Sequence, residues 1–284
     1  MESGLIAARF VHIAALAMAF GAALFPFYVY GDPRSWPDGT RLGKLHIAAA
    51  IVALLSAFAW LYFTAVAITD DTSFGAVWMV LRLTAFGTLW LGRLVLAVFV
   101  VTLALLPLRR WAAWTELVFL AMLLASLAQT GHALTGGEIH IVADALHLLA
   151  AGAWIGGLLP LGFALAEQED ATSTLHRFSA MGLTAVAVLI ASGLVNGLFL
   201  VGTPWALVTT TYGHILLIKL ALFVLMLALA ARNRFVLMPR MSNGDNTAHS
   251  MLLRAVVAEQ SLGLLVLMLV AVLGTLEPAI EAVT

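Results

Sequence analysis

The sequence predicts an all-α integral membrane protein of about eight transmembrane helices, arranged as two parallel four-helix repeats with both termini outside. Three observations lead to this fold class. Of the 284 residues, 63% are hydrophobic and 10% are charged, whereas a soluble domain carries about 25% charged residues. Apolar runs of about 20 residues, long enough to cross a bilayer as a helix, recur along the whole chain. Similar polar residues also recur in the same order in the two halves.

Short loops rich in Gly, Pro, Asp and Ser separate the eight expected spans. The spans cover residues 4–28, 42–68, 85–106, 113–130, 139–166, 175–200, 213–231 and 251–276. We expect the first run to be a retained span and not a signal peptide, because Glu2 replaces the usual basic segment and the run is too long. The loops after the first, third, fifth and seventh spans are basic. The positive-inside rule therefore places these loops in the cytoplasm and both termini outside.

An internal repeat is predicted from matched residues in the two halves. The matched pairs are His12 with His147, Gly21 with Gly156, Gly87 with Gly213, Arg93 with Lys219, and Glu116 with Glu259. Equivalent spans lie four apart, so the two halves share one orientation, with a site expected where they meet. This interpretation divides the chain into residues 1–135 and 136–284. It also makes His12 and His147 symmetry mates that face one another.

Polar residues concentrate at the outer end of the fifth span. On a helix, His140, Asp144 and His147 lie within about 60° of one another and form one polar stripe. Such residues are costly inside a bilayer unless they face a cavity, a partner or an ion. We therefore expect a metal or cofactor site here, which His12 reaches from about 10 Å along the first helix. The candidate ligands are His12, His132, His140, Asp144, His147 and His214.

Each candidate also has a purely structural interpretation. An intramembrane histidine can hydrogen-bond a backbone carbonyl and hold two helices together. His132 can cap a helix end, and His140 and His214 can be interfacial residues beside solvent. Asp144 is expected to orient an imidazole by accepting its hydrogen bond.

Several classes of function are excluded by composition. The chain has no Cys, so disulfides and thiolate metal sites are excluded and a soft metal must use His or Met. A net charge of −1 without a basic tail predicts no nucleic-acid partner. Hydrolase, phosphate-loop and zinc-protease motifs are absent, so we predict that the protein is not an enzyme.

The second half resembles the copper resistance protein D (CopD) family, most clearly over residues 174–278. The matching positions are Arg177-Phe178-Ser179, Ser192-Gly193-Leu194 with Asn196, Thr211-Tyr212-Gly213 with Lys219, Asn233-Arg234 with Pro239, Arg254 with Glu259, and Pro278, preceded by Gly131-His132-Ala133, Asp144 with His147, and Trp154-Ile155-Gly156-Gly157. The resemblance implies a multi-pass protein of the bacterial inner membrane. Such a protein takes copper at the periplasmic face and moves it across or into the membrane.

The resemblance also implies His132, His147 and His12 as copper ligands, and a small periplasmic copper-binding protein of the CopC type as a partner. Imidazole suits both Cu(I) and Cu(II), so the oxidation state stays open. Two alternatives remain at this point. Facing histidines on two helices can ligate a b-type haem, as in membrane redox proteins. The same site can also serve a copper-delivery or assembly factor that transports nothing.

Overall fold

The structure is a computed structural model that describes residues 2–32, 41–106, 110–131, 136–167 and 172–283. All regular secondary structure in these ranges is helical, and eight helices are long and apolar enough to cross a membrane. They are α1 (Glu2–Val29), α2 (Arg41–Thr69), α4 (Ala85–Leu105), α5 (Arg110–Ala125) with the 3-10 turn η1 (Ser126–Thr130), α6 (Gly137–Glu167), α7 (Thr172–Leu200), α9 (Thr211–Arg232) and α11 (Asn246–Leu273). The predicted all-α membrane fold with eight spans is confirmed.

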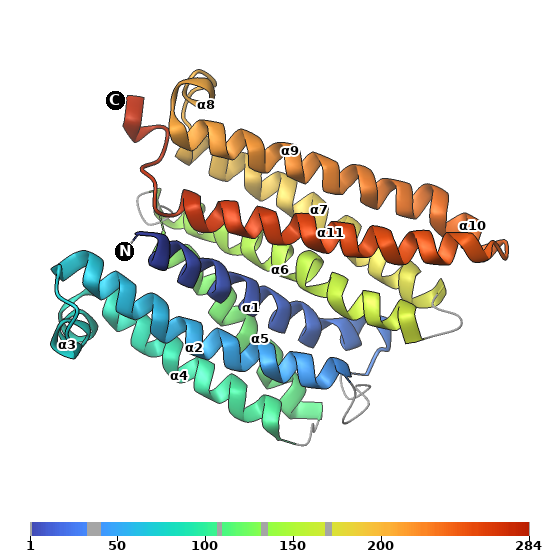
Figure 1. Cartoon of the computed structure of the whole chain (residues 1–284), viewed down its shortest axis with the longest axis horizontal. Coiled ribbons are helices and arrows are strands. Elements are labelled where there is room, and N and C mark those ends of the chain that lie inside the picture. Colours follow the sequence, from blue (N-terminus) through green and yellow to red (C-terminus); the bar gives the residue numbers. More distant parts are fainter. Residues whose placement is uncertain (1, 33–40, 107–109, 132–135, 168–171, 284) are drawn as a thin grey trace.

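Shorter helices complete the chain, and the sequence analysis did not predict them. They are α3 (Phe74–Leu83), α8 (Ala206–Thr209), the π-helical turn η3 (Asn233–Leu237), α10 (Met238–Ser242) and η4 (Glu281–Val283). Both termini lie at the same end of the bundle as α3 and α8, and α10 lies at the opposite end (Figure 1). Because α6 starts at the end that holds the termini, its first turns share that end with the start of α1.

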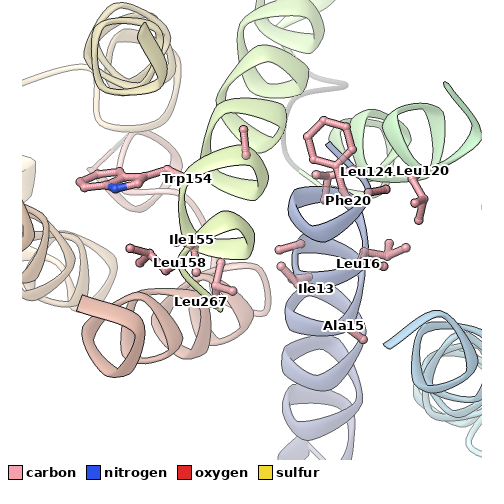
Figure 2. Packing of buried hydrophobic residues seen from close by; sticks show 14 of the residues in the cluster. Ile13, Ala15, Leu16, Phe20, Leu120, Leu124, Trp154, Ile155, Leu158 and Leu267 are labelled. Atoms are coloured by element: carbon pink, nitrogen blue, oxygen red, sulfur yellow. The ribbon is translucent and has the colours of Figure 1, made fainter. Parts of the chain in front are cut away.

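The helices α1 and α6 form the centre of the bundle (Figure 1). In their most apolar 18-residue stretches, 72% of α1 and 67% of α6 are buried, against 6% of α9. The two helices cross at glycines: a Cβ on Gly156 would lie 1.9 Å from the carbonyl oxygen of Ala17, and one on Gly21 would lie 2.3 Å from the carbonyl carbon of Gly156. Small residues permit such close approach of helices in membranes. Beyond the crossing, Phe20 points from α1 toward Leu124 of α5 (Figure 2).

The helices α4 and α9 begin with the same cap. The side-chain oxygen of Thr84 accepts a hydrogen bond from the backbone N–H of Gly87 at 2.9 Å, and Thr210 accepts one from Gly213 at 3.0 Å. At both glycines, a Cβ would collide with a carbonyl oxygen of the preceding short helix, at 2.1 Å and 2.4 Å. The shared construction supports the internal repeat. The repeat, its boundary after residue 135 and the orientation in the membrane stay predictions.

The two halves differ in how tightly their outer helices pack. In the first half α2 packs along α4, whereas the counterpart helices α7 and α9 are not closely packed over the residues described. Trp60 of α2 and Trp90 of α4 fill the first interface, with ring centroids 5.0 Å apart. Counted from Gly87 and Gly213, the position in α9 that corresponds to Trp90 is Leu216. Counted from Ser56 and Ser192, the hydroxyl partners of His12 and His147, the position in α7 that corresponds to Trp60 is Asn196. The second half therefore replaces two large rings by smaller side chains.

Candidate functional site

His12 lies inside the first half and uses both ring nitrogens. The side chain is 2% exposed, and its Nδ1 lies 2.9 Å from the carbonyl oxygen of Ala53 and 3.1 Å from Ser56 Oγ. Its Nε2 lies 2.9 Å from Nη2 of Arg93. Because a guanidinium only donates hydrogen bonds, Nε2 accepts from Arg93 and the imidazole proton belongs on Nδ1. The lone pair that would bind a metal is already used.

Arg93 is as deeply buried as His12, the histidine to which it donates. The residue is 2% exposed, and its Nη1 donates to the carbonyl oxygen of Leu123 at 2.6 Å and to Ser126 Oγ. The guanidinium also lies over the ring of Trp90, 5.0 Å from its centroid. Arg93 thus ties α4 to α1, α5 and η1, and its charge is met by acceptors and a π face.

His147 has a similar partner on Nδ1 in the second half. Its Nδ1 lies 3.0 Å from Ser192 Oγ of α7. Since that hydroxyl donates its own hydrogen to the carbonyl oxygen of Val188 at 2.6 Å, it accepts from Nδ1–H of His147. This fixes the tautomer with the lone pair on Nε2, which is how outer partners orient metal-binding imidazoles. His147 is only partly buried.

Two charged residues belong to the same region of the second half as this imidazole. Asp144 lies three residues earlier in α6, and its Oδ1 accepts a hydrogen bond from Asn196 Nδ2 at 3.0 Å. Lys219 of α9 is partly buried and acts electrostatically on both His147 and Asp144. The buried Tyr212 also interacts electrostatically with Asp144. The second half therefore places one imidazole, one carboxylate and one ammonium on α6 and α9, toward the end of the bundle that holds the termini.

The remaining candidates have other environments. His140 is 1% exposed, and its ring stacks on Phe199 with centroids 4.7 Å apart and planes 8° from parallel. His214 is exposed, and its Nε2 lies 3.0 Å from the carbonyl oxygen of Val208. His132 lies outside the described residues. Within the described ranges, no group of three or more His, Asp or Glu side chains is arranged to hold a metal ion.

The expected pairing of His12 with His147 is not among the described contacts. His12 contacts α2 and α4, whereas the Nδ1 partner of His147 lies on α7. What the structure adds is the role of Ser56 and Ser192, to which the sequence analysis gave no function. A signal existed, since each is a hydroxyl residue within an apolar span.

Two buried carboxyl groups lie toward the opposite end of the bundle. Glu116 of α5 and Glu259 of α11 are each 3% exposed. Glu116 Oε1 lies 2.7 Å from His46 Nε2, and Glu259 Oε1 accepts a hydrogen bond from Asn233 Nδ2 at 2.5 Å. The matched carboxyl groups therefore have different partners in the two halves.

Comparison with known proteins gives consistent matches along the chain. Residues 172–273 match the family Copper resistance protein D, and residues 1–141 match the Copper resistance protein D-like N-terminal domain. The chain is 33% identical over 286 residues to the inner membrane protein YebZ of Escherichia coli (strain K12), covering 96% of this chain and 98% of YebZ. It is 35% identical over 302 residues to copper resistance protein D of Pseudomonas syringae pv. tomato, covering 98% and 97%.

A third relative is the copper transport protein CutJ of Bacillus subtilis (strain 168). The identity is 36% over an alignment of 217 residues that covers 70% of this chain and 39% of CutJ. No solved structure matches the chain.

Proposed function

We propose that this chain, which belongs to the copper resistance protein D family, binds copper at the outer end of its second half and passes it inward across the bacterial inner membrane. YebZ is named as an inner membrane protein, which supports the proposed location, and CutJ is named as a copper transport protein, which supports transport. The observation that carries the proposal is the orientation of His147. Ser192 accepts the hydrogen bond of its Nδ1–H, so the lone pair of this imidazole is on Nε2, and Asp144 lies three residues earlier in the same helix.

The proposed ligands are Nε2 of His147 and the carboxylate of Asp144, with His132 from the segment before α6 as the third. Imidazole and carboxylate together suit Cu(II), and imidazole alone also suits Cu(I). His140 and His214 are proposed as peripheral, because the first stacks on Phe199 and the second lies against a local carbonyl. A CopC-type protein in the periplasm is a suitable donor of copper to a site at this end.

His12 receives a structural role in this proposal. Arg93 occupies its Nε2 lone pair through a hydrogen bond, whereas the matched cation of the second half, Lys219, acts on His147 electrostatically. The hydrogen bond from Arg93 weighs against a haem held between His12 and His147, since axial ligation needs a free imidazole nitrogen on each side of the iron.

Copper content tests the ligand proposal directly. Purified wild-type protein loaded with copper is expected to retain about one equivalent, and His147→Ala to retain almost none, because a site of three ligands loses its central imidazole. His214→Ala is the matched control: it removes an exposed histidine from the same end of the bundle and is expected to retain the metal. Elemental analysis after gel filtration gives the ratio. Full retention by His147→Ala would move the site elsewhere, and a Soret band lost in that variant would favour haem.

Uptake into liposomes separates transport from delivery. Wild-type protein reconstituted in vesicles is expected to carry copper into the lumen, and His147→Ala to give the rate of empty vesicles. Binding without uptake by the wild type would favour a copper-delivery or assembly factor that uses the same site.

Lys219→Met is expected to raise the affinity for copper. The ammonium of Lys219 acts on both His147 and Asp144, so it opposes a second cation there, and its removal is expected to tighten binding about tenfold. Lys44→Met is the control, because Lys44 is an exposed lysine near the start of α2, at the end of the bundle opposite the termini. Competition with a chelator of known affinity measures both. Weaker binding in Lys219→Met would mean that Lys219 supports the site.

A further inference from the structure

A cavity of about 310 Å³ lies between α6, α7, α9, η3 and α11. The loose packing of α7 against α9 leaves this space. The cavity lies in the half of the bundle nearer to α10, away from His147. Leu183 and Phe235 line it and are 60% and 72% exposed. Both belong to spans whose outer surface faces lipid, so the cavity opens sideways into the bilayer.

The walls suit a flat apolar molecule. Most lining side chains are aliphatic, and three are aromatic: Trp154, Phe178 and Phe235. Trp154 lies on the side of α6 that faces away from α1 (Figure 2). A volume near the lower end of the range for small-molecule sites, roughly 300–1,000 Å³, fits a single substituted ring.

The polar groups of the cavity include a hydrogen-bond acceptor that has no donor among the described residues. Asn233 and Glu259 line it and are 9% and 3% exposed. The amide N–H of Asn233 is used by Glu259, and its Oδ1 has no hydrogen-bond partner among the described residues. A buried acceptor without a donor is unfavourable and rare. Asn233 also begins the π-helical turn η3, and such turns are frequent at functional sites.

We propose that this cavity binds a lipid-phase quinol, whose ring lies among the aromatic walls and whose hydroxyl group donates to Asn233 Oδ1, with Glu259 beside it as a second acceptor. A cation is disfavoured, because the guanidinium of Arg234 also lines the cavity, donating to Ser179 Oγ at 2.5 Å. An acyl chain fits the walls but offers no donor. The site is separate from the copper site and does not depend on it.

The first half supplies the internal comparison. There the matched carboxyl group of Glu116 is met by His46 of the protein itself, and α2 packs along α4. In the second half the matched carboxyl group of Glu259 is met by the amide of Asn233 in place of a histidine, and α7 and α9 are not closely packed over the residues described. A ligand from the membrane would fill the space between these helices and donate to the Oδ1 of Asn233.

Binding of reduced and oxidised forms of one ring compound tests the proposal. The full chain in copper-free phosphatidylcholine nanodiscs is titrated anaerobically with decylubiquinol and with decylubiquinone, by calorimetry. The quinol is expected to bind about tenfold more tightly, because only the reduced form donates a hydrogen bond to the buried acceptor. Asn233→Leu is expected to abolish the preference while leaving quinone binding unchanged.

A second variant keeps the test independent of Asn233. Leu183→Trp places a large ring at the exposed rim and is expected to weaken binding of both compounds at least tenfold. Leu194→Trp is its control, since Leu194 is 69% exposed on the same helix and lies outside the cavity. Equal affinity for quinol and quinone in the wild type would overturn the proposal. Displacement of both compounds by oleate, with no preference for the quinol over the quinone, would also overturn it and would identify an acyl-chain site.

Discussion

Gly156→Ala is expected to lower the free energy of unfolding by about 3 kcal/mol or more, the upper range for overpacked cores. The added methyl would lie 1.9 Å from the carbonyl oxygen of Ala17. A backbone atom cannot rotate away, so α1 and α6 must separate, and these are the two most deeply buried spans. Thermal unfolding in detergent, followed by circular dichroism, measures the loss.

Gly197→Ala provides the control for this substitution. It makes the same change within α7, where a new Cβ meets no described atom within 4 Å. Ala is preferred to Gly in a helix by about 0.5–1 kcal/mol, so this variant is expected to match or exceed the wild type. Similar losses in the two variants would show that the crossing of α1 and α6 does not depend on glycine. Gly21→Ala affects the same contact, so its cost and that of Gly156→Ala are expected to be less than additive.

Arg93→Met is expected to destabilise the protein by about 3 kcal/mol, because buried acceptors on His12, Leu123 and Ser126 lose their donor. For a chain of this size, that corresponds to a fall of about 6–12 °C in the unfolding midpoint. Copper bound per folded molecule is expected to stay unchanged, since the proposed copper site belongs to the other half. Scanning fluorimetry and elemental analysis of the same sample measure the two quantities.

Arg82→Met is the control for Arg93→Met. It removes an exposed guanidinium group in place of a buried one. Arg82 is exposed, and its described contact is with the ring of Trp78, 4.6 Å from the centroid. Its replacement is expected to shift the midpoint by no more than about 1–2 °C, as for most surface substitutions. If Arg93→Met left the midpoint unchanged, or lost copper, Arg93 would belong to the copper site and not to the framework of the first half.

The amino-acid sequence by itself determined the class of protein and the positions of its spans. Runs of apolar residues long enough to cross a bilayer leave few alternatives, because every backbone polar group in lipid must be satisfied within a helix. The sequence also singled out His147 and Asp144 as neighbours, since their spacing puts them on one face of a helix. The family resemblance was confirmed by the comparisons over both halves.

Only the tertiary structure distinguished His12 from His147, which look alike in sequence. The difference lies in what other helices supply: the guanidinium of Arg93 hydrogen-bonds Nε2 of His12, whereas Lys219 acts on His147 electrostatically. The cavity between α7 and α9 could not be predicted from the sequence either. Hydropathy shows that a helix is in the membrane, but lipid is as apolar as leucine, so the packing of one helix on another depends on side-chain shape and hydrogen bonds. Those are properties of pairs of helices, and a single stretch of sequence does not contain them.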